Sequence, residues 1–367
     1  MSALEDVTVV DLTTSFWAST GTGLLTDFGA NVVRVHQNNL PKHERLLAHR
    51  NKRQNPVTGD SELHNLIEKA DVFATDLPFT QLQERGLDYE PLTAKNPSLI
   101  YACASGYGPE GPDRDLPALD ELAAARTGMM PILPQPGEPP VYTGSGQMYS
   151  SVMLALGVML ALHHRQETGE GQRVDVSLFG GNIYGASLDI QAYLAIGGER
   201  FLHPLSRLDA GNPMSGPAYP ASDGRWVTLT MPDTDRYWPR FAPIVGLDPA
   251  DLRFDSHEKR CEAHRLELIG HLDATFRKQP SAHWKGQILE LGLSADVIEE
   301  YDYPANDPEA RTNHYVIDVG GADSIGFPVH MSETPAELRN HMWVEAPAST
   351  LRAGALSHGV RSTDDRA

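Results

Sequence analysis

The stretch VYTGSGQMYSSVMLALGVMLALHHRQETGEGQRVDVSLF, residues 141–179, decides the fold of this chain. Its apolar side chains cover nearly every face of a helix over residues 148–166, which predicts a buried helix at the centre of the protein. A membrane span is the competing interpretation. However, Ser150 and Ser151 interrupt the apolar run, and the letters HHR at 163–165 end it after about a dozen residues, whereas a span needs about twenty. The pattern therefore favours a core helix.

A glycine-rich break and a strand follow this helix. Gly169 and Gly171 end the helical pattern, and residues 173–178 alternate between apolar and polar side chains as a strand does. The turn, the helix, the glycines that end it and the strand together predict a central part of an α/β domain. The turn at residues 144–147 lies at its edge, where we expect a site.

The composition is that of an ordinary globular protein with an excess of acidic groups. Of 367 residues, 40% are hydrophobic and 22% charged, and 49 Asp and Glu against 30 Lys and Arg give a net charge of −19. This charge disfavours nucleic acids and anionic membranes as partners, because phosphate binding needs clustered cations. Cys103 and Cys261 are too few for a disulfide framework. The first residues show no signal-peptide pattern, so we expect a cytoplasmic protein.

The first 35 residues predict a β-α-β unit, with strands at 7–12 and 31–35 and a helix at 20–28. Such a unit implies a parallel sheet with a right-handed crossover. Gly21 and Gly23 suggest a dinucleotide fingerprint, but its third glycine is missing, so close packing of the helix is favoured.

The rest of the chain divides into further α/β units and a smaller second domain. Residues 36–59 are polar and basic without a period and predict a surface loop. Gly, Pro and Ser become frequent after residue 196, which predicts a linker. We expect a large domain at 1–196, a linker at 197–220, a small domain at 221–317, and a return to the large domain with a loose C-terminal tail at 318–367. Helices are predicted at 60–70, 79–86, 119–128, 178–196, 236–245, 259–276 and 282–291, and strands at 71–74, 98–104 and 226–231.

One group of possible metal ligands lies in the small domain. His257, Cys261 and His264 share one face of a predicted helix, with His271 two turns further on. This spacing can bind zinc or nickel. The alternative is an inward-facing cysteine with solvated histidines, and the charged residues mixed into the helix favour it. We therefore expect no metal.

Several segments, in order and spacing, resemble one known family. They are VVDLTTSFWASTGTGLLTDFGANVVRV at 9–35, NKR at 51–53, ERGLDYEPLTAKNPSLIYACASGYGPEGP at 84–112, TGEGQRVDVSLF at 168–179 and DGRW at 223–226. Together they resemble the family III CoA-transferases, which include formyl-CoA transferases, carnitine CoA-transferases and 2-methylacyl-CoA racemases. The resemblance implies a Rossmann-like large domain, a small α+β domain and two subunits interlocked like links of a chain. It also implies CoA or acyl-CoA as a substrate, with no covalently bound cofactor.

The resemblance implies a catalytic aspartate just ahead of the central helix. In the family this carboxylate attacks the thioester, releases CoA thiolate and holds the acyl group as an anhydride. The chemistry needs a carboxylate, because the group must act both as nucleophile and as leaving group. The corresponding residue here is Gln147. A neutral amide is a poor nucleophile and cannot carry an acyl group reversibly.

At other positions, too, the chain lacks residues that the family uses for catalysis or for binding CoA. Where the racemases have a histidine beside an aspartate, this chain has Leu119 before Asp120, so proton exchange loses one of its two bases. The ENFRPG-like segment that helps to hold CoA is replaced by TDLPFT at 75–80, without an arginine for phosphate. A small residue in the first CoA-lining turn is replaced by Trp17.

The resemblance also supplies candidate contacts to CoA. Each has a structural alternative, because the bulky side chains can equally pack in the core and the cations can equally lie on the surface. These candidates are Ser15, Phe16, Trp17, Arg34, Lys52, Arg53, Asp76 and Leu77.

We therefore predict a catalytically degenerate subunit of a heteromeric acyl-CoA:carboxylate CoA-transferase rather than a self-sufficient enzyme. Its partner would be a homologous family III subunit, or a second copy of itself. The alternative is an active transferase that uses another carboxylate, Asp120 or Glu121. A CoA-linked racemase or isomerase is a weaker alternative because of Leu119.

Overall fold

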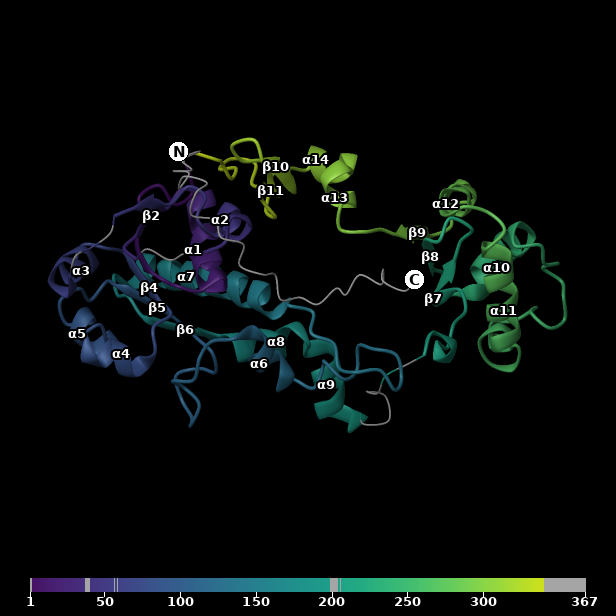
Figure 1. Cartoon of the computed structure of the whole chain (residues 1–367), viewed down its shortest axis with the longest axis horizontal. Coiled ribbons are helices and arrows are strands. Elements are labelled where there is room, and N and C mark those ends of the chain that lie inside the picture. Colours follow the sequence, from purple (N-terminus) through teal and green to yellow (C-terminus); the bar gives the residue numbers. More distant parts are fainter. Residues whose placement is uncertain are drawn as a thin grey trace, which may run out of the picture.

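A parallel sheet of six strands forms the centre of the large domain in the computed structural model of the chain (Figure 1). The structure describes residues 2–36, 40–55, 57, 59–198, 204 and 206–339. The strand order is β3-β2-β1-β4-β5-β6, which is that of a Rossmann fold. This confirms the predicted α/β class with a Rossmann-like large domain. The strands are β1 (Thr8–Leu12), β2 (Asn31–Arg34), β3 (Arg53–Gln54), β4 (Val72–Thr75), β5 (Ile100–Ser105) and β6 (Arg173–Ser177).

Helices cover both faces of this sheet, and alternate side chains of each strand meet one layer or the other. Val9 packs in a core with α1 (Phe16–Asp27) and α7 (Gly146–Thr168). Val10 packs on the opposite face in a core with residues of three other helices. This two-sided burial explains the continuous apolar runs of the strands. The second layer consists of α3 (Asp60–Ile67), α4 (Phe79–Glu84) and α5 (Tyr89–Thr93).

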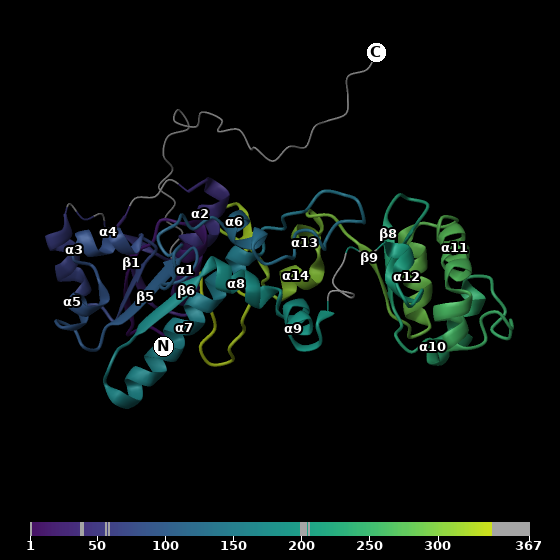
Figure 2. The ribbon, with the colours of Figure 1, turned by 90° about the horizontal axis from the view of Figure 1, so that it is seen from below.

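The central helix α7 is buried on one face only, so the prediction of burial on all sides was wrong for the single chain. Leu154 and Val158 pack in the core, whereas Val152, Leu156 and Leu160 are more than half exposed. By length and composition alone α7 could cross a membrane, and one third of its most apolar window is buried. Figure 2 shows part of α7 extending beyond the sheet.

The prediction of a surface loop over residues 36–59 was also wrong. Helix α2 (Lys42–Ala48) and strand β3 lie within this segment. The side chains of Arg50 and Lys52 are almost fully buried, because Arg50 is paired with Asp27 at the end of α1 and Lys52 with Asp11 on β1. The polar residues of this segment thus include two buried ion-paired cations as well as exposed side chains such as Arg53.

Several predicted boundaries differ from the structure. Helix α1 begins four residues before the predicted residue 20. The long helix at 178–196 is two helices, α8 (Leu178–Gly185) and α9 (Ser187–Ile196). The short helix α6 (Asp120–Ala125) precedes a loop that leads to α7.

The small domain is a three-stranded antiparallel sheet covered by helices. Strand β7 (Ser215–Pro220) lies within the predicted linker but pairs with β8 (Trp226–Thr230), which pairs with β9 (Ala295–Ile298). Tyr219, Phe241 and Phe276 are fully buried in its core. The helices are α10 (Thr234–Ile244), α11 (Arg265–Phe276) and α12 (Ser281–Glu290).

The predicted helix at 259–276 is interrupted in the structure. Residues Lys259–Ala263 form a π-helical turn, and α11 begins only after His264. His257 bonds to Thr234, and His271 bonds to the carbonyl oxygen of Val245. Within the described residues, these histidines do not gather with Cys261 into a set of metal ligands.

The chain then returns to the large domain (Figure 1). Helices α13 (Tyr303–Asn306) and α14 (Pro308–Thr312) lead to the hairpin of β10 (Val316–Asp318) and β11 (Asp323–Ile325). Arg50 donates hydrogen bonds to the carbonyl oxygens of Ile325 and Gly326 and fastens this segment to the large domain. The predicted C-terminal tail beyond residue 339 lies outside the described residues.

Candidate functional site

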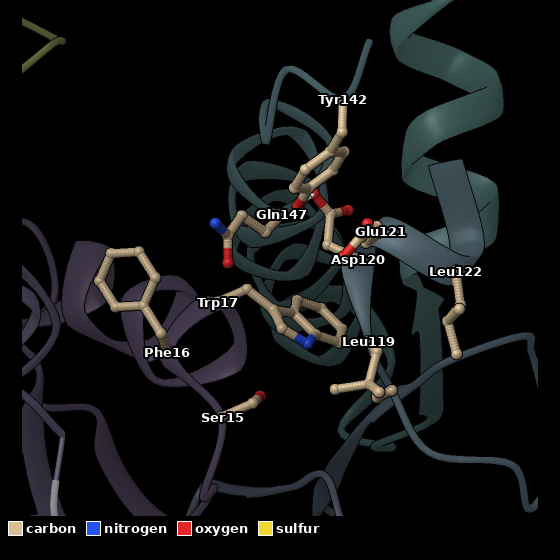
Figure 3. A pocket seen from close by; sticks show the side chains of 10 residues that line it. Ser15, Phe16, Trp17, Leu119, Asp120, Glu121, Leu122, Tyr142 and Gln147 are labelled. Carbon is tan, nitrogen blue, oxygen red and sulfur yellow. Dashed lines mark hydrogen bonds between the residues drawn. The ribbon is translucent and has the colours of Figure 1, made fainter. Parts of the chain in front are cut away.

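A pocket of about 400 Å³ lies where the first turns of α1, α6 and α7 meet (Figure 3). It brings together seven residues that the sequence singled out from three distant segments: Ser15, Phe16, Trp17, Leu119, Asp120, Glu121 and Gln147. Its lining consists of Ser15, Phe16, Trp17, Ala118, Leu119, Asp120, Glu121, Leu122, Tyr142 and Gln147.

The pocket lies near the point where the strand order reverses, between β1 and β4. In doubly wound sheets, ligands bind outside the carboxyl ends of the strands at this point. Asp76 follows β4, and its carboxylate accepts hydrogen bonds from the backbone N–H groups of Thr14 (2.8 Å) and Ser15 (2.6 Å). Asp76 thus fixes the loop after β1 that carries Ser15, Phe16 and Trp17. It lines no part of the pocket.

Gln147 lies in the first turn of α7, and main-chain contacts hold it there. The hydroxyl of Ser151 lies 2.7 Å from the carbonyl oxygen of Gln147 and 2.7 Å from that of Trp17, which joins α7 to α1. Gly146 allows α7 to approach α8, because a Cβ at this position would lie 2.1 Å from the side-chain amide of Asn182. The turn is therefore positioned without help from the Gln147 side chain.

Asp120 is buried at the start of α6, and hydrogen bonds engage both of its carboxylate oxygens. Tyr142 donates its hydroxyl proton to one oxygen (2.7 Å), and Asn182 donates from its amide to the other (2.8 Å). Burial, together with the hydrogen bond to Asp120, raises the pKa of Tyr142, so this phenol stays protonated and keeps donating. Asp120 is thus held in place by its neighbours.

The remaining lining residues determine the polarity of the pocket. Glu121 is exposed, and Leu119 is 55% exposed. The lining contains two carboxylates and no Lys, Arg or His. Gln147 presents a neutral amide to this space (Figure 3). The pocket can therefore bind and orient a polar ligand, while its one residue at the expected nucleophile position lacks the chemistry to capture an acyl group.

The candidate cations do not line this pocket. The ammonium group of Lys52 contacts Asp11 (2.9 Å), Ser19 Oγ (3.0 Å) and Thr22 Oγ1 (2.8 Å). Burial lowers the pKa of Lys52 to about 8, although Asp11 opposes the shift. Arg34 is buried nearby at the end of β2. These contacts give Lys52 a structural role inside the domain.

Arg53 and Leu77, the remaining candidates, also lie apart from the pocket lining. Arg53 is exposed on β3, at the edge of the sheet. Leu77 packs against the core on the α3–α5 side. Of the candidates for CoA binding, Ser15, Phe16 and Trp17 therefore line the pocket, and the others do not.

Sequence reasoning missed three residues that build the site: Tyr142, Ser151 and Asn182. Tyr142 lies in a Pro-rich loop with no periodicity, and Asn182 lies 62 residues from the carboxylate that it contacts. Ser151 was noted only as an interruption of an apolar helix. A polar residue in such a helix needs a buried hydrogen-bond partner, and this was the available signal.

Comparison with known proteins gives consistent results. The sequence profile of CoA-transferase family III matches residues 4–347. The (R)-2-hydroxy-4-methylpentanoate CoA-transferase of Clostridioides difficile is 28% identical over 342 residues, covering 85% of this chain and 84% of that protein. The succinyl-CoA–L-malate CoA-transferase alpha subunit of Chloroflexus aurantiacus is 27% identical over 374 residues, covering 92% of this chain and 85% of that protein.

The fold also matches solved structures. A CAIB/BAIF family protein from Brucella suis superposes with a TM-score of 0.79, at 22% identity, over 92% of this chain and 94% of that one. At this identity the match supports the architecture alone.

Proposed function

Because the chain belongs to CoA-transferase family III, we propose that it is a catalytically degenerate subunit of a heteromeric acyl-CoA:carboxylate CoA-transferase. The observation that supports the proposal is Gln147, a neutral amide that lines the pocket and that the sequence resemblance assigns to the position of the family's nucleophile. The relatives named above act as CoA-transferases, so the substrate class is a CoA thioester with a carboxylic acid as acceptor.

The family reaction requires a carboxylate nucleophile, which Gln147 does not provide. A carboxylate attacks the thioester carbon, CoA leaves as a thiolate, and the resulting anhydride passes the acyl group onward. Attack by an amide of Gln147 would instead form an imide, and the amide is not nucleophilic at neutral pH. The chain therefore keeps the binding architecture, and the covalent step belongs to another subunit.

Asp120 is the principal alternative nucleophile, because its carboxylate lines the same pocket. To react it would have to give up the hydrogen bond from Tyr142 or from Asn182 while remaining buried. Loss of a charge-assisted hydrogen bond costs about 1.5–3 kcal/mol. Glu121 is exposed and free of this restraint. Both alternatives can be tested directly.

An exposed apolar strip on α7 supports the proposal of a partner. Tyr149, Val152, Leu156 and Leu160 follow one another at helical spacing along α7, and all are exposed in the single chain. We call this the α7 strip. A contiguous apolar strip of this kind favours an interface. The chain also passes twice between its two domains (Figure 1). We propose a homologous family III subunit as the partner that covers the α7 strip, interlocked with this chain.

The test compares the chain alone with the chain co-expressed with a homologous subunit from a neighbouring gene. We expect the lone chain to give no CoA transfer and no acyl adduct by mass spectrometry after incubation with acyl-CoA, and the co-purified pair to give both. The Gln147→Ala variant should leave the activity of the pair largely intact. Robust transfer by the lone chain that is abolished in Gln147→Ala would contradict the proposal, and transfer abolished by Asp120→Asn or Glu121→Gln would identify the alternative nucleophile.

A further inference from the structure

Two buried polar atoms on the wall of the pocket lack a hydrogen-bond partner among the described residues: Ser15 Oγ and Trp17 Nε1. The Trp17 side chain is 2% exposed, so its indole N–H is shielded from bulk solvent. Buried polar groups in folded proteins are nearly always paired, and an unpaired one is destabilising. Two such atoms on the wall of one pocket indicate a ligand group that the pocket receives.

The helix does not use the Ser15 hydroxyl. Ser15 is the N-cap residue of α1, where a serine side chain usually accepts a hydrogen bond from the first turn, but here it makes no such bond. The carboxylate of Asp76 instead accepts from the N–H groups of Thr14 and Ser15. The hydroxyl is thereby available to a ligand. In Figure 3 it and the indole nitrogen of Trp17 face the same space beside Leu119.

The chemistry of the pocket determines which group fits. An indole N–H can only donate, so its partner must be an acceptor. A carbonyl oxygen has two lone pairs and can accept from the indole and the hydroxyl together. The lining supplies the carboxylates of Asp120 and Glu121 and no cation, so a further carboxylate would enter an already negative pocket without a counter-charge. The acceptor that fits is a neutral carbonyl oxygen.

We infer that Ser15 Oγ and Trp17 Nε1 together donate hydrogen bonds to the neutral carbonyl oxygen of a thioester, which the pocket binds without covalent capture and in preference to the free acid. This inference rests on the proposed function and specifies the ligand of its site. Leu119 borders the same space, and more than half of its side chain is exposed. It can therefore move aside for the ligand with little loss of buried contact.

The test measures binding to the full-length chain, with S-butyryl-N-acetylcysteamine as a neutral thioester and butyrate as the matched acid. Calorimetry should show that the thioester binds at least tenfold more tightly than butyrate. Trp17→Phe keeps the aromatic ring and removes only the N–H, and Ser15→Ala removes only the hydroxyl. Each should weaken thioester binding about five- to tenfold, in line with the loss of one hydrogen bond. Trp226→Phe, at an exposed position in the small domain, serves as the matched control and should leave binding unchanged.

A second measurement follows binding in the wild-type chain itself. With ¹⁵N-labelled tryptophan the chain gives indole N–H signals from its five tryptophans. The signal of Trp17, assigned by its absence in Trp17→Phe, should move downfield as thioester is added and stay in place with butyrate. Failure of the thioester to bind, equal or tighter binding of butyrate, or thioester binding that leaves the Trp17 signal unmoved would each overturn the inference. None of these results concerns CoA transfer, so the proposed function stands or fails separately.

Discussion

Replacing Arg50 with methionine tests how the large domain holds its buried charges and the returning chain. The guanidinium of Arg50 donates to both carboxylate oxygens of Asp27, at 2.9 Å and 2.6 Å. It also donates to the carbonyl oxygens of Ile325 and Gly326, and lies 4.8 Å from the centre of the Phe327 ring. One side chain thus joins α1 to a segment almost three hundred residues away.

The expected loss of stability in Arg50→Met follows from the burial of the ion pair. Both side chains of the Arg50–Asp27 pair are 1% exposed, and removing one partner of a buried pair costs about 3–5 kcal/mol, because the other charge is left uncompensated. The Arg85–Asp60 pair is a matched control with the same 2.6 Å contact, but its side chains are 33% and 44% exposed. Arg85→Met should therefore cost at most about 1 kcal/mol.

The pH dependence has a definite sign. Burial already raises the pKa of Asp27 above its usual value, although Arg50 opposes the shift. Without Arg50 the pKa of Asp27 rises further, so the folded state holds a proton that the unfolded state has released. Stability is then lost as the pH rises from about 4 through the folded pKa. The free-energy penalty of Arg50→Met should be larger at pH 8 than at pH 5, and adding Asp27→Asn should recover part of it.

Urea unfolding, followed by circular dichroism at pH 5 and pH 8, measures these differences. Both arginines lie in the large domain, so the same transition reports both variants. A penalty for Arg50→Met within about 1 kcal/mol of that for Arg85→Met, or one that does not change with pH, would refute this account of the buried pair.

Two further predictions concern single positions. Burial, with Lys52 and Arg34 nearby, lowers the pKa of His49 to about 3, so the unfolded state takes up the proton first and stability should fall as the pH drops from about 6.5 toward 3, by up to about 1.4 kcal/mol per pH unit. Urea midpoints should depend less on pH in His49→Gln than in wild type, and a slope equal to that of wild type would count against the burial of this imidazole. Gly157→Ala in α7 would place a Cβ 2.5 Å from Val174 Cγ1, whereas Gly270→Ala in α11 meets nothing within 4 Å. Thermal unfolding should show the first destabilised by about 1–3 kcal/mol and the second stabilised by about 0.5–1 kcal/mol, and equal shifts would contradict the predicted clash.

The fold was largely predictable because its signals are local. Alternating contacts such as those of Val9 and Val10, and the left-handed turn at Gly169 (φ 79°), are encoded in short stretches. The segment at 36–59 was not predictable in this way. Arg50 and Lys52 are buried there because Asp27 and Asp11, from other elements, neutralise them. Periodicity cannot reveal a partner that lies far away in the chain.

The site, like the fold, was predictable from the sequence only in part. The resemblance selected Ser15, Phe16, Trp17, Asp120 and Gln147, and these residues line one pocket. The residues that hold them were missed, because their role depends on close approaches between helices. Apolar residues on nearly every face predicted that α7 is buried, yet the single chain leaves the α7 strip exposed. The apolar pattern of α7 indicates that these side chains favour burial, but it does not indicate which surface covers them.

The contacts around Gln147 explain how the pocket can keep its shape whichever side chain stands at this position. Ser151 holds the turn through carbonyl oxygens, and Gly146 provides the space for Asn182, which in turn orients Asp120. None of these interactions uses the Gln147 side chain, so the geometry of the pocket does not depend on which residue stands there. Loss of the carboxylate would therefore leave stability unchanged, and a partner subunit that supplied the reaction would leave no selection to restore it. The same independence makes Gln147→Asp a clean chemical test. It should fold like the wild type, and an acyl adduct in this variant would show that the nucleophile alone is missing.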